Sequence, residues 1–388
     1  MKKKFCVTLA LIFTLALSAC GKTDSPAPIA SGSDPSDTSV AAIPPSDGQP
    51  GQSPSSCAFD LTLFGGKLQS CAYAGNGTLL VLADKLYLYD TGTSSVLATT
   101  EAPLRDFEAQ AVDGGCVLSG MGDSGMMAYI YDSSLSLNRE IAVDELLQGD
   151  FVISETGGVA ASTDGKKLAF AALGGLYLYD LESGSLTTLL DVAQNAGTAG
   201  IRVSMLNGAA FAQDNSQIMF YGSGSSIPAA DGEEDFSIYG SIAVDGSGLK
   251  LTKPSGYEME EMQSSVSRLF FPQAFTQADG TLLWVDRATG GANTLSFSAG
   301  GEGKDGVYSS EQGNYVATAV LGSNLTVRVY DVASGALVAT EVIENSDPTY
   351  FYRIPRIYLL DGAKTAVVVL GGSIDELDTL VSTFEFGA

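Results

Sequence analysis

The residues of this sequence that could do chemistry are mainly carboxylates. The chain contains 45 Asp and Glu residues against 20 Lys and Arg residues. The densest acidic group is the DGEED motif at residues 231–235, in which Asp231, Glu233 and Asp235 could bind Ca²⁺ through their oxygens. This motif lacks the ordered alternate spacing of a calcium-binding loop. It is a weak metal candidate, and we expect no other cofactor.

The sequence contains no histidine. This absence excludes a Ser-His-Asp or Cys-His nucleophile system and any His-ligated metal site. Carboxylate pairs such as Glu260 and Glu261 could carry out glycosidase chemistry, but among so many acids their spacing carries no information. We therefore expect no catalytic residues and a protein that is not an enzyme. An envelope hydrolase or lyase is the least favoured hypothesis.

The densest aromatic and basic group is a candidate binding surface. It contains Tyr350, Tyr352, Arg353 and Arg356. If these side chains are exposed, they could stack on sugars or bind an acidic or aromatic peptide. The favoured alternative is that alternate members face the core, as the two-residue period of a strand requires.

The elements that would position these residues are short strands in repeated units. Residues 160–191 (AASTDGKKLAFAALGGLYLYDLESGSLTTLLD) contain four apolar segments separated by Gly, Asp and Ser, which favour tight turns. A strand that ends in an acidic residue before a turn recurs at roughly one propeller-blade length. The acids at the ends of these strands are Asp90, Asp132, Asp180, Asp245, Asp286 and Asp331.

These repeats resemble the blades of TolB-type β-propellers. The segments STDGKKLAF and GLYLYDLESGSLTTL match the pattern of a Ser-Pro-Asp-Gly turn, an apolar strand and a strand ending in Asp. LTVRVYDVASGALVA is similar to YVTN-type and WD-type blades. Thr163, Gln213 and Glu311 stand where the usual proline would be. The resemblance implies a propeller that acts as a protein-binding scaffold, and it identifies no partner residue.

The predicted fold is all-β, a single β-propeller at residues 57–388 with about seven four-stranded blades. Six or eight blades are the alternatives. The predicted blade cores lie near residues 68–100, 106–143, 151–191, 201–253, 265–298, 306–343 and 354–386. We expect the insertion at residues 223–235 to form a loop. We also expect residues 57–64 to close the ring as the outer strand of the last blade, because an open ring would leave strand edges unpaired.

The N-terminal segment predicts a lipid anchor. Residues 1–19 have three lysines and an apolar run too short to span a bilayer, which indicates a signal peptide. Residues 17–20 (LSAC) resemble a bacterial lipobox, in which Cys20 would be acylated. Residues 20–56 are rich in Ser, Pro and Gly and predict a disordered tether. The expected location is the extracytoplasmic face of a bacterial envelope membrane, with the lipid anchor as the only membrane contact.

Charge and cysteine content constrain the partners. Removal of residues 1–19 takes away three lysines and no acid, which changes the formal net charge from −25 to −28. Such a charge argues against nucleic acid. Cys57 and Cys71 could form a disulfide, Cys71 and Cys116 are the rival pair, and buried free thiols are the third alternative. The leading functional prediction is a scaffold for an envelope protein, with glycan or small-ligand binding as the alternative.

Overall fold

The computed structural model describes residues 59, 61–64, 68, 70–104, 107–123, 125–150, 152, 158–228, 234–273, 280–297, 306–344, 355–371 and 379–387. All of them lie in one unit, Pro54–Ala388. The predicted signal peptide, tether and Cys20 fall outside the described residues. No described helix is both long enough and apolar enough to cross a membrane.

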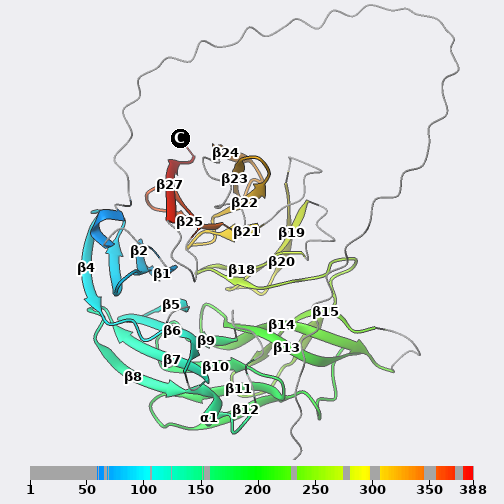
Figure 1. The fold of residues 1–388 in the computed structure, drawn as a ribbon. Helices are drawn as coiled ribbons and strands as arrows, with labels where there is room; N and C mark the ends of the chain where they lie inside the picture. Colours follow the sequence, from blue (N-terminus) through cyan, green and yellow to red (C-terminus); the bar gives the residue numbers. More distant parts are fainter. Residues whose placement is uncertain are drawn as a thin grey trace, which may run out of the picture. The chain divides into compact units, whose positions relative to one another are not determined.

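Antiparallel sheets follow one another around a ring (Figure 1). Over the described residues there are seven sheets, six with four strands and one with three. Each sheet is built from strands that are consecutive in the sequence. The first strands of successive sheets contact one another, so they form the inner wall of the ring. This arrangement is an all-β, seven-bladed β-propeller, as the repeats predict.

The first four blades occupy residues 70–252, and their bounds agree closely with the predicted blade cores. Blade 1 contains β1 (Ser70–Gly75), β2 (Thr78–Leu82), β3 (Leu86–Asp90) and β4 (Ser95–Thr100). Blade 2 contains β5 (Glu108–Val112), β6 (Gly115–Gly122), β7 (Gly125–Asp132) and β8 (Leu137–Ala142), followed by helix α1 (Val143–Leu146). Blade 3 contains β9 (Val159–Ala161), β10 (Lys167–Ala171), β11 (Gly175–Asp180) and β12 (Leu186–Asp191). Blade 4 contains β13 (Ile201–Phe211), β14 (Gln217–Ser226), β15 (Phe236–Ala243) and β16 (Lys250–Thr252).

The remaining three blades follow the same plan. Blade 5 contains β17 (Gln263–Ser264), β18 (Arg268–Phe271), β19 (Thr281–Asp286) and β20 (Ala292–Ser296). Blade 6 contains β21 (Gly306–Ser309), β22 (Tyr315–Leu321), β23 (Leu325–Asp331) and β24 (Leu337–Ile343). Blade 7 contains β25 (Arg356–Leu360), β26 (Thr365–Gly371) and β27 (Thr379–Glu385).

The acid that ends the third strand of a blade stabilises the turn into the fourth strand. Asp180 Oδ1 accepts hydrogen bonds from the Ser183 N–H at 2.8 Å and the Ser183 hydroxyl at 2.9 Å. These bonds hold the pKa of Asp180 below its usual value. The five equivalent acids accept similar bonds from residues two to four positions later, and they are Asp90, Asp132, Asp245, Asp286 and Asp331.

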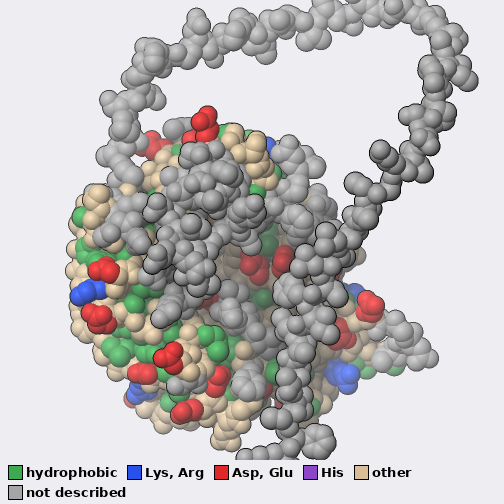
Figure 2. Space-filling view, in the orientation of Figure 1, with side chains coloured by type: hydrophobic (Ala, Val, Ile, Leu, Met, Phe, Trp, Pro, Cys, Tyr) green, Lys and Arg blue, Asp and Glu red, His purple; other side chains and the backbone are tan. Residues whose placement is uncertain are grey.

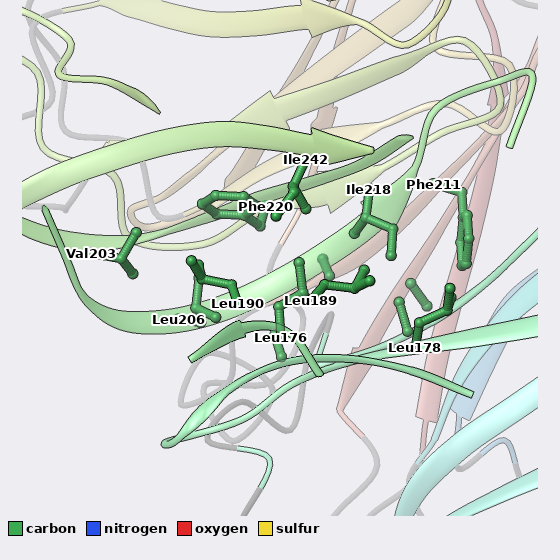
Figure 3. Packing of buried hydrophobic residues seen from close by; sticks show 14 of the residues in the cluster. Leu176, Leu178, Leu189, Leu190, Val203, Leu206, Phe211, Ile218, Phe220 and Ile242 are labelled. Atoms are coloured by element: carbon green, nitrogen blue, oxygen red, sulfur yellow. The ribbon is translucent and has the colours of Figure 1, made fainter. Parts of the chain in front are cut away.

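Apolar side chains between adjacent blades form the core. Between blades 3 and 4, Leu176 and Leu190 pack with Leu206, Phe211 and other buried side chains (Figure 3). Full burial of such a side chain contributes about 1.5–3 kcal/mol. Because each cluster needs side chains from two sheets, a blade is stabilised mainly by its neighbours.

The predicted loop at residues 223–235 is wrong in part. Residues 223–226 continue β14, where Ser223 pairs with Met205 on one side and with Ser237 on the other. Backbone hydrogen bonds in this longer sheet, together with the buried Val203 and Ile238, favour strand over loop. Residues 229–233 lie outside the described part.

The predicted closing strand at residues 57–64 is also wrong in its described part. Leu61–Phe64 forms a 3₁₀ helix, and Cys57 is outside the described residues. The seam between blades 1 and 7 is instead filled by side chains. Phe59 and Phe64 are buried in one cluster with Tyr89 of β3 and with Tyr358 and Val367 of the last blade.

Candidate functional site

The two faces of the propeller carry different connections. The turn face carries the connections between first and second strands and between third and fourth strands. The mouth face carries the connections between second and third strands and those that lead to the next blade. The names turn face and mouth face are used in this sense below.

A cavity of about 630 Å³ lies at the centre of the inner wall. It is lined by residues of β1, β5, β13, β17, β21 and β25, which are first strands of six blades. Gly120 and Met121, near the mouth-face end of β6, also line it, so the cavity opens toward the mouth face. Acidic side chains are visible in the recess near the centre of the ring (Figure 2). We call this cavity the central channel.

Three tyrosines, Tyr73, Tyr308 and Tyr358, are among the residues that line the central channel, and their rings also pack against the apolar clusters between blades. Their hydroxyl groups hold the inner strands together. Tyr358 donates to the Cys71 carbonyl at 2.7 Å, Tyr308 donates to the Pro355 carbonyl, and the Tyr73 hydroxyl accepts from the Leu359 N–H at 2.6 Å. These hydrogen bonds occupy the polar end of each ring, so the tyrosines contribute mainly aromatic surface to the channel.

The same three-residue pattern, Glu-x-Gln, opens the inner strand β5 and leads into the inner strand β17, where its glutamine is the first strand residue. In blade 2, Gln110 bonds the backbone of β9 through the Val159 carbonyl at 2.7 Å and the Ala161 N–H at 2.8 Å. In blade 5, Gln263 bonds β21 in the same way, through the Val307 carbonyl and the Ser309 N–H at 2.9 Å. Both glutamines therefore connect one inner strand to the next.

The glutamates of this pattern, Glu108 and Glu261, line the central channel. Glu108 lies two residues before Gln110 in β5, so these two side chains lie on the same side of that strand, and Glu261 lies two residues before the start of β17. Glu261 accepts a hydrogen bond from the Gln263 amide at 2.6 Å. Burial raises the pKa of Glu261, and the Glu260 charge adds to this effect while the Gln263 bond opposes it.

The channel narrows toward the turn face. Gly75 has a φ of +95°, and a Cβ at this position would lie 2.6 Å from Ala111 Cβ and 4.0 Å from Glu311 Oε1. Glu311 is 6% exposed. Its Oε2 accepts from the Gly77 N–H at 3.3 Å, and within the described residues its Oε1 has no hydrogen-bond partner. Burial raises the pKa of this carboxyl.

On the turn face, the positions that lack the expected proline connect neighbouring blades. The Thr163 N–H donates to Asn215 Oδ1 at 2.9 Å, and the Gln213 N–H donates to the Arg287 carbonyl at 3.1 Å. Proline has no N–H and could make neither bond. The absence of proline from these two turns, at Thr163 and Gln213, therefore has a physical reason.

Arg287 provides a second connection on the turn face, between blades 4 and 5. It is 8% exposed. Its guanidinium donates to the Phe211 carbonyl at 2.7 and 2.9 Å and to the Ser265 carbonyl at 2.5 Å. Burial lowers the pKa of Arg287 to about 10, so the side chain stays charged at neutral pH.

The residues predicted for binding have different outcomes. Tyr350, Tyr352 and Arg353 lie outside the described residues. Arg356 begins β25 and lines the central channel. Its role in binding stays a prediction.

The calcium prediction is likewise untested. Asp231 and Glu233 lie outside the described residues, and Asp235 is exposed. In the part of the chain that is described, no three acidic or cysteine side chains gather as a metal site would require.

Cys71 and Cys116 are both buried and are not joined to each other, so the rival Cys71–Cys116 disulfide is not formed. Burial raises the pKa of both thiols, that of Cys116 to about 12. Such thiols are poor nucleophiles at neutral pH. The Cys57–Cys71 pair stays a prediction because Cys57 lies outside the described residues.

Among the channel residues, the sequence patterns pointed to Arg356 but not to the others. Glu261 stood out only as part of an uninformative acidic pair, and no pattern pointed to Gln110, Gln263 or Tyr73. The available signal was the repetition of Glu-x-Gln at the start of two blades, at residues 108–110 and 261–263.

Fold and site together define a repeat protein of the seven-bladed β-propeller class, with a central channel open at one face. Comparison with models of known protein families, and with curated proteins, finds no match to this chain.

Proposed function

We propose that this protein is a membrane-anchored, extracytoplasmic scaffold that binds an envelope protein through its mouth face. The fold is one that supports protein-binding scaffolds in general. The lipobox-like residues that end at Cys20 and the tether at 20–56 support the anchor. A lipid chain on Cys20 would hold the propeller at the membrane surface.

One observation carries the docking proposal. Three consecutive blades each present an exposed apolar side chain on the mouth face, at the end of the second strand or in the connection that follows it. Met121 of blade 2 is 53% exposed, Leu173 of blade 3 is 51% exposed and Ile227 of blade 4 is 44% exposed. Neighbouring apolar groups of this kind on one face are typical of protein-binding surfaces.

The charge of the chain supports a partner with basic side chains. Asp123 and Asp235, which adjoin the same connections, are exposed, and the net charge is −25. A partner with an apolar centre and a basic rim would complement this face.

Chemical crosslinking in the protein's own cells tests the docking proposal. The full chain would be captured and its crosslinked partners identified by mass spectrometry, comparing wild type with Met121→Ser and Leu173→Ser. We expect one or two proteins with wild type and about tenfold less of them with the variants. Leu337→Ser is a matched control, because Leu337 is 43% exposed on the outer strand β24. Unchanged capture by both mouth variants would contradict the proposal.

The anchor has its own test. Cys20→Ser removes the thiol that would be acylated, so we expect the variant to leave the membrane fraction. If the variant sediments with membranes as wild type does, the anchor is wrong.

A second candidate function, small-ligand or glycan binding, is supported by the central channel. Its volume of about 630 Å³ lies within the usual range of ligand sites, about 300–1,000 Å³. Its aromatic walls and few polar groups are also typical of such sites.

A further inference from the structure

The central channel offers two acidic side chains and one basic side chain among mostly apolar and aromatic lining residues. The acids are Glu108 and Glu261, from blades 2 and 5, and the base is Arg356 from blade 7. Because both glutamates hold the same position in the Glu-x-Gln pattern, they enter the channel from corresponding points of two different blades. The channel therefore presents carboxylates from more than one side.

The carboxylate of Glu261 is held in place. Its bond to the Gln263 amide, at 2.6 Å, orients it, and Gln263 is itself fixed to the backbone of β21. Burial takes water away from this carboxylate, which makes its negative charge costly without a compensating group. A bound cation would supply that compensation.

The tyrosine rings favour the same kind of ligand. Tyr73, Tyr308 and Tyr358 each donate their O–H to a backbone carbonyl, so they have no donor left for sugar hydroxyls. Aromatic rings beside carboxylates are a recurring environment for ammonium groups, which are attracted by the ring quadrupole.

We propose that the central channel binds a small organic cation, an ammonium or guanidinium group on an apolar body, between Glu108, Glu261 and the tyrosine rings. This inference rests on the channel being a ligand site, the second function proposed above. It does not depend on docking at Met121 and Leu173. Arg356 also lines the channel, so its positive charge should oppose the binding of a cation there.

Binding of three probes to the purified full chain tests the inference by titration calorimetry. Benzyltrimethylammonium is the cation, benzyl alcohol the neutral probe and benzoate the anion. We expect the cation to bind, and we expect the neutral and anionic probes to bind with an affinity at least about tenfold lower. Glu261→Gln should lower the affinity for the cation about tenfold, and Arg356→Gln should raise this affinity a few-fold.

Glu260→Gln is the matched control, because Glu260 is the adjacent residue in the sequence, is exposed and does not line the channel. It removes the same charge, which makes only a minor contribution to the raised pKa of Glu261, so cation binding should change far less than with Glu261→Gln. Thermal unfolding of each variant confirms that it is folded. The opposite effects of Glu261→Gln and Arg356→Gln separate a local charge from a general loss of structure.

Three results would overturn the inference. Equal weakening by Glu260→Gln and Glu261→Gln would mean that only surface charge attracts the cation. Tighter binding of benzoate or benzyl alcohol than of the cation, with this binding lost on substitution of Arg356 or Glu261, would show that the channel is a ligand site. It would reject the proposal that the ligand is a cation. Absence of binding by all three probes would reject the cation as well, while leaving the crosslinking test of docking unaffected.

Discussion

The turn face and the mouth face of this propeller use polar side chains differently. On the turn face, Asp180 and its equivalents bond their own turns, and Thr163, Gln213 and Arg287 bond neighbouring blades. On the mouth face, apolar side chains such as Leu173 are exposed, and the channel opens with carboxylates in its wall. Polar side chains on the turn face therefore maintain the ring, whereas the mouth face keeps apolar side chains exposed around an open channel.

The largest expected effect is that of Arg287→Ala on the turn face. The substitution leaves the buried Phe211 and Ser265 carbonyls without their donor, so we expect a loss of about 3 kcal/mol in the free energy of unfolding. Denaturant unfolding measures it. Arg287→Lys should recover only part of the loss, because one ammonium lacks the planar fork that reaches both carbonyls. An Ala variant as stable as wild type would show that this connection does not hold blades 4 and 5 together.

A smaller effect is expected for Asp331→Ala, which tests the acidic turns. Asp331 accepts from Ser334 N–H at 2.8 Å and from its hydroxyl at 2.6 Å, so the loss should be about 1 kcal/mol. The control Glu344→Ala, at an exposed acid, should change stability by less than about 0.5 kcal/mol.

The Asp331 effect should also depend on pH. The hydrogen bonds from Ser334 lower the pKa of Asp331 in the folded state. Its stabilisation is therefore present above the unfolded pKa of about 3.9 and is lost as the pH falls through the lower folded value. A difference between wild type and variant that stays constant down to strongly acidic pH would contradict the proposed role.

Glu311→Gln should change the stability in the opposite direction and stabilise the protein at neutral pH. Because burial raises the pKa of Glu311, the folded state binds its proton more tightly, and stability falls as pH rises from the unfolded value through the folded one. Gln keeps the acceptor for Gly77 N–H and carries no charge, so the variant should melt higher than wild type at pH 7. The gain should vanish below the unfolded pKa of about 4.3. Thermal melts at both pH values decide this, and a variant less stable at pH 7 would show that the charge is needed.

The smallest effect on stability is expected on the mouth face. Leu173→Ser removes an exposed side chain, so we expect a change within about 0.5 kcal/mol together with the loss of partner capture described above. Thermal unfolding and crosslinking of the same preparation measure both. A destabilisation comparable to that of Arg287→Ala would remove the distinction between the two faces.

Much of the fold was predictable because its determinants are local. The alternation of apolar segments with turns containing Asp, Gly and Ser placed the blades close to their observed bounds, for example 306–343 for blade 6. Asp180 and Asp331 ended the strands that they were expected to end. Each of these features depends on residues within a few positions of one another.

Other features depend on contacts that a linear pattern does not contain. Residues 223–226 continue a strand because Met205 and Ser237 lie beside Ser223. Phe59 and Phe64 fill the seam because blades 1 and 7 meet there, which strand propensity alone does not reveal. A closing strand was therefore predicted at residues 57–64, where the structure has aromatic side chains packed between blades 1 and 7.

By itself, the sequence determined the all-β class, the blade length, the turns and the exclusion of histidine chemistry, because composition and short-range periodicity carry that information. Only the tertiary structure decided which side chains share the central channel. Glu108, Glu261 and Arg356 are far apart in the chain and meet only because the first strands of successive blades form the inner wall. The same closure gives Thr163 and Arg287 their partners in neighbouring blades, and it leaves Met121 and Leu173 exposed on the opposite face.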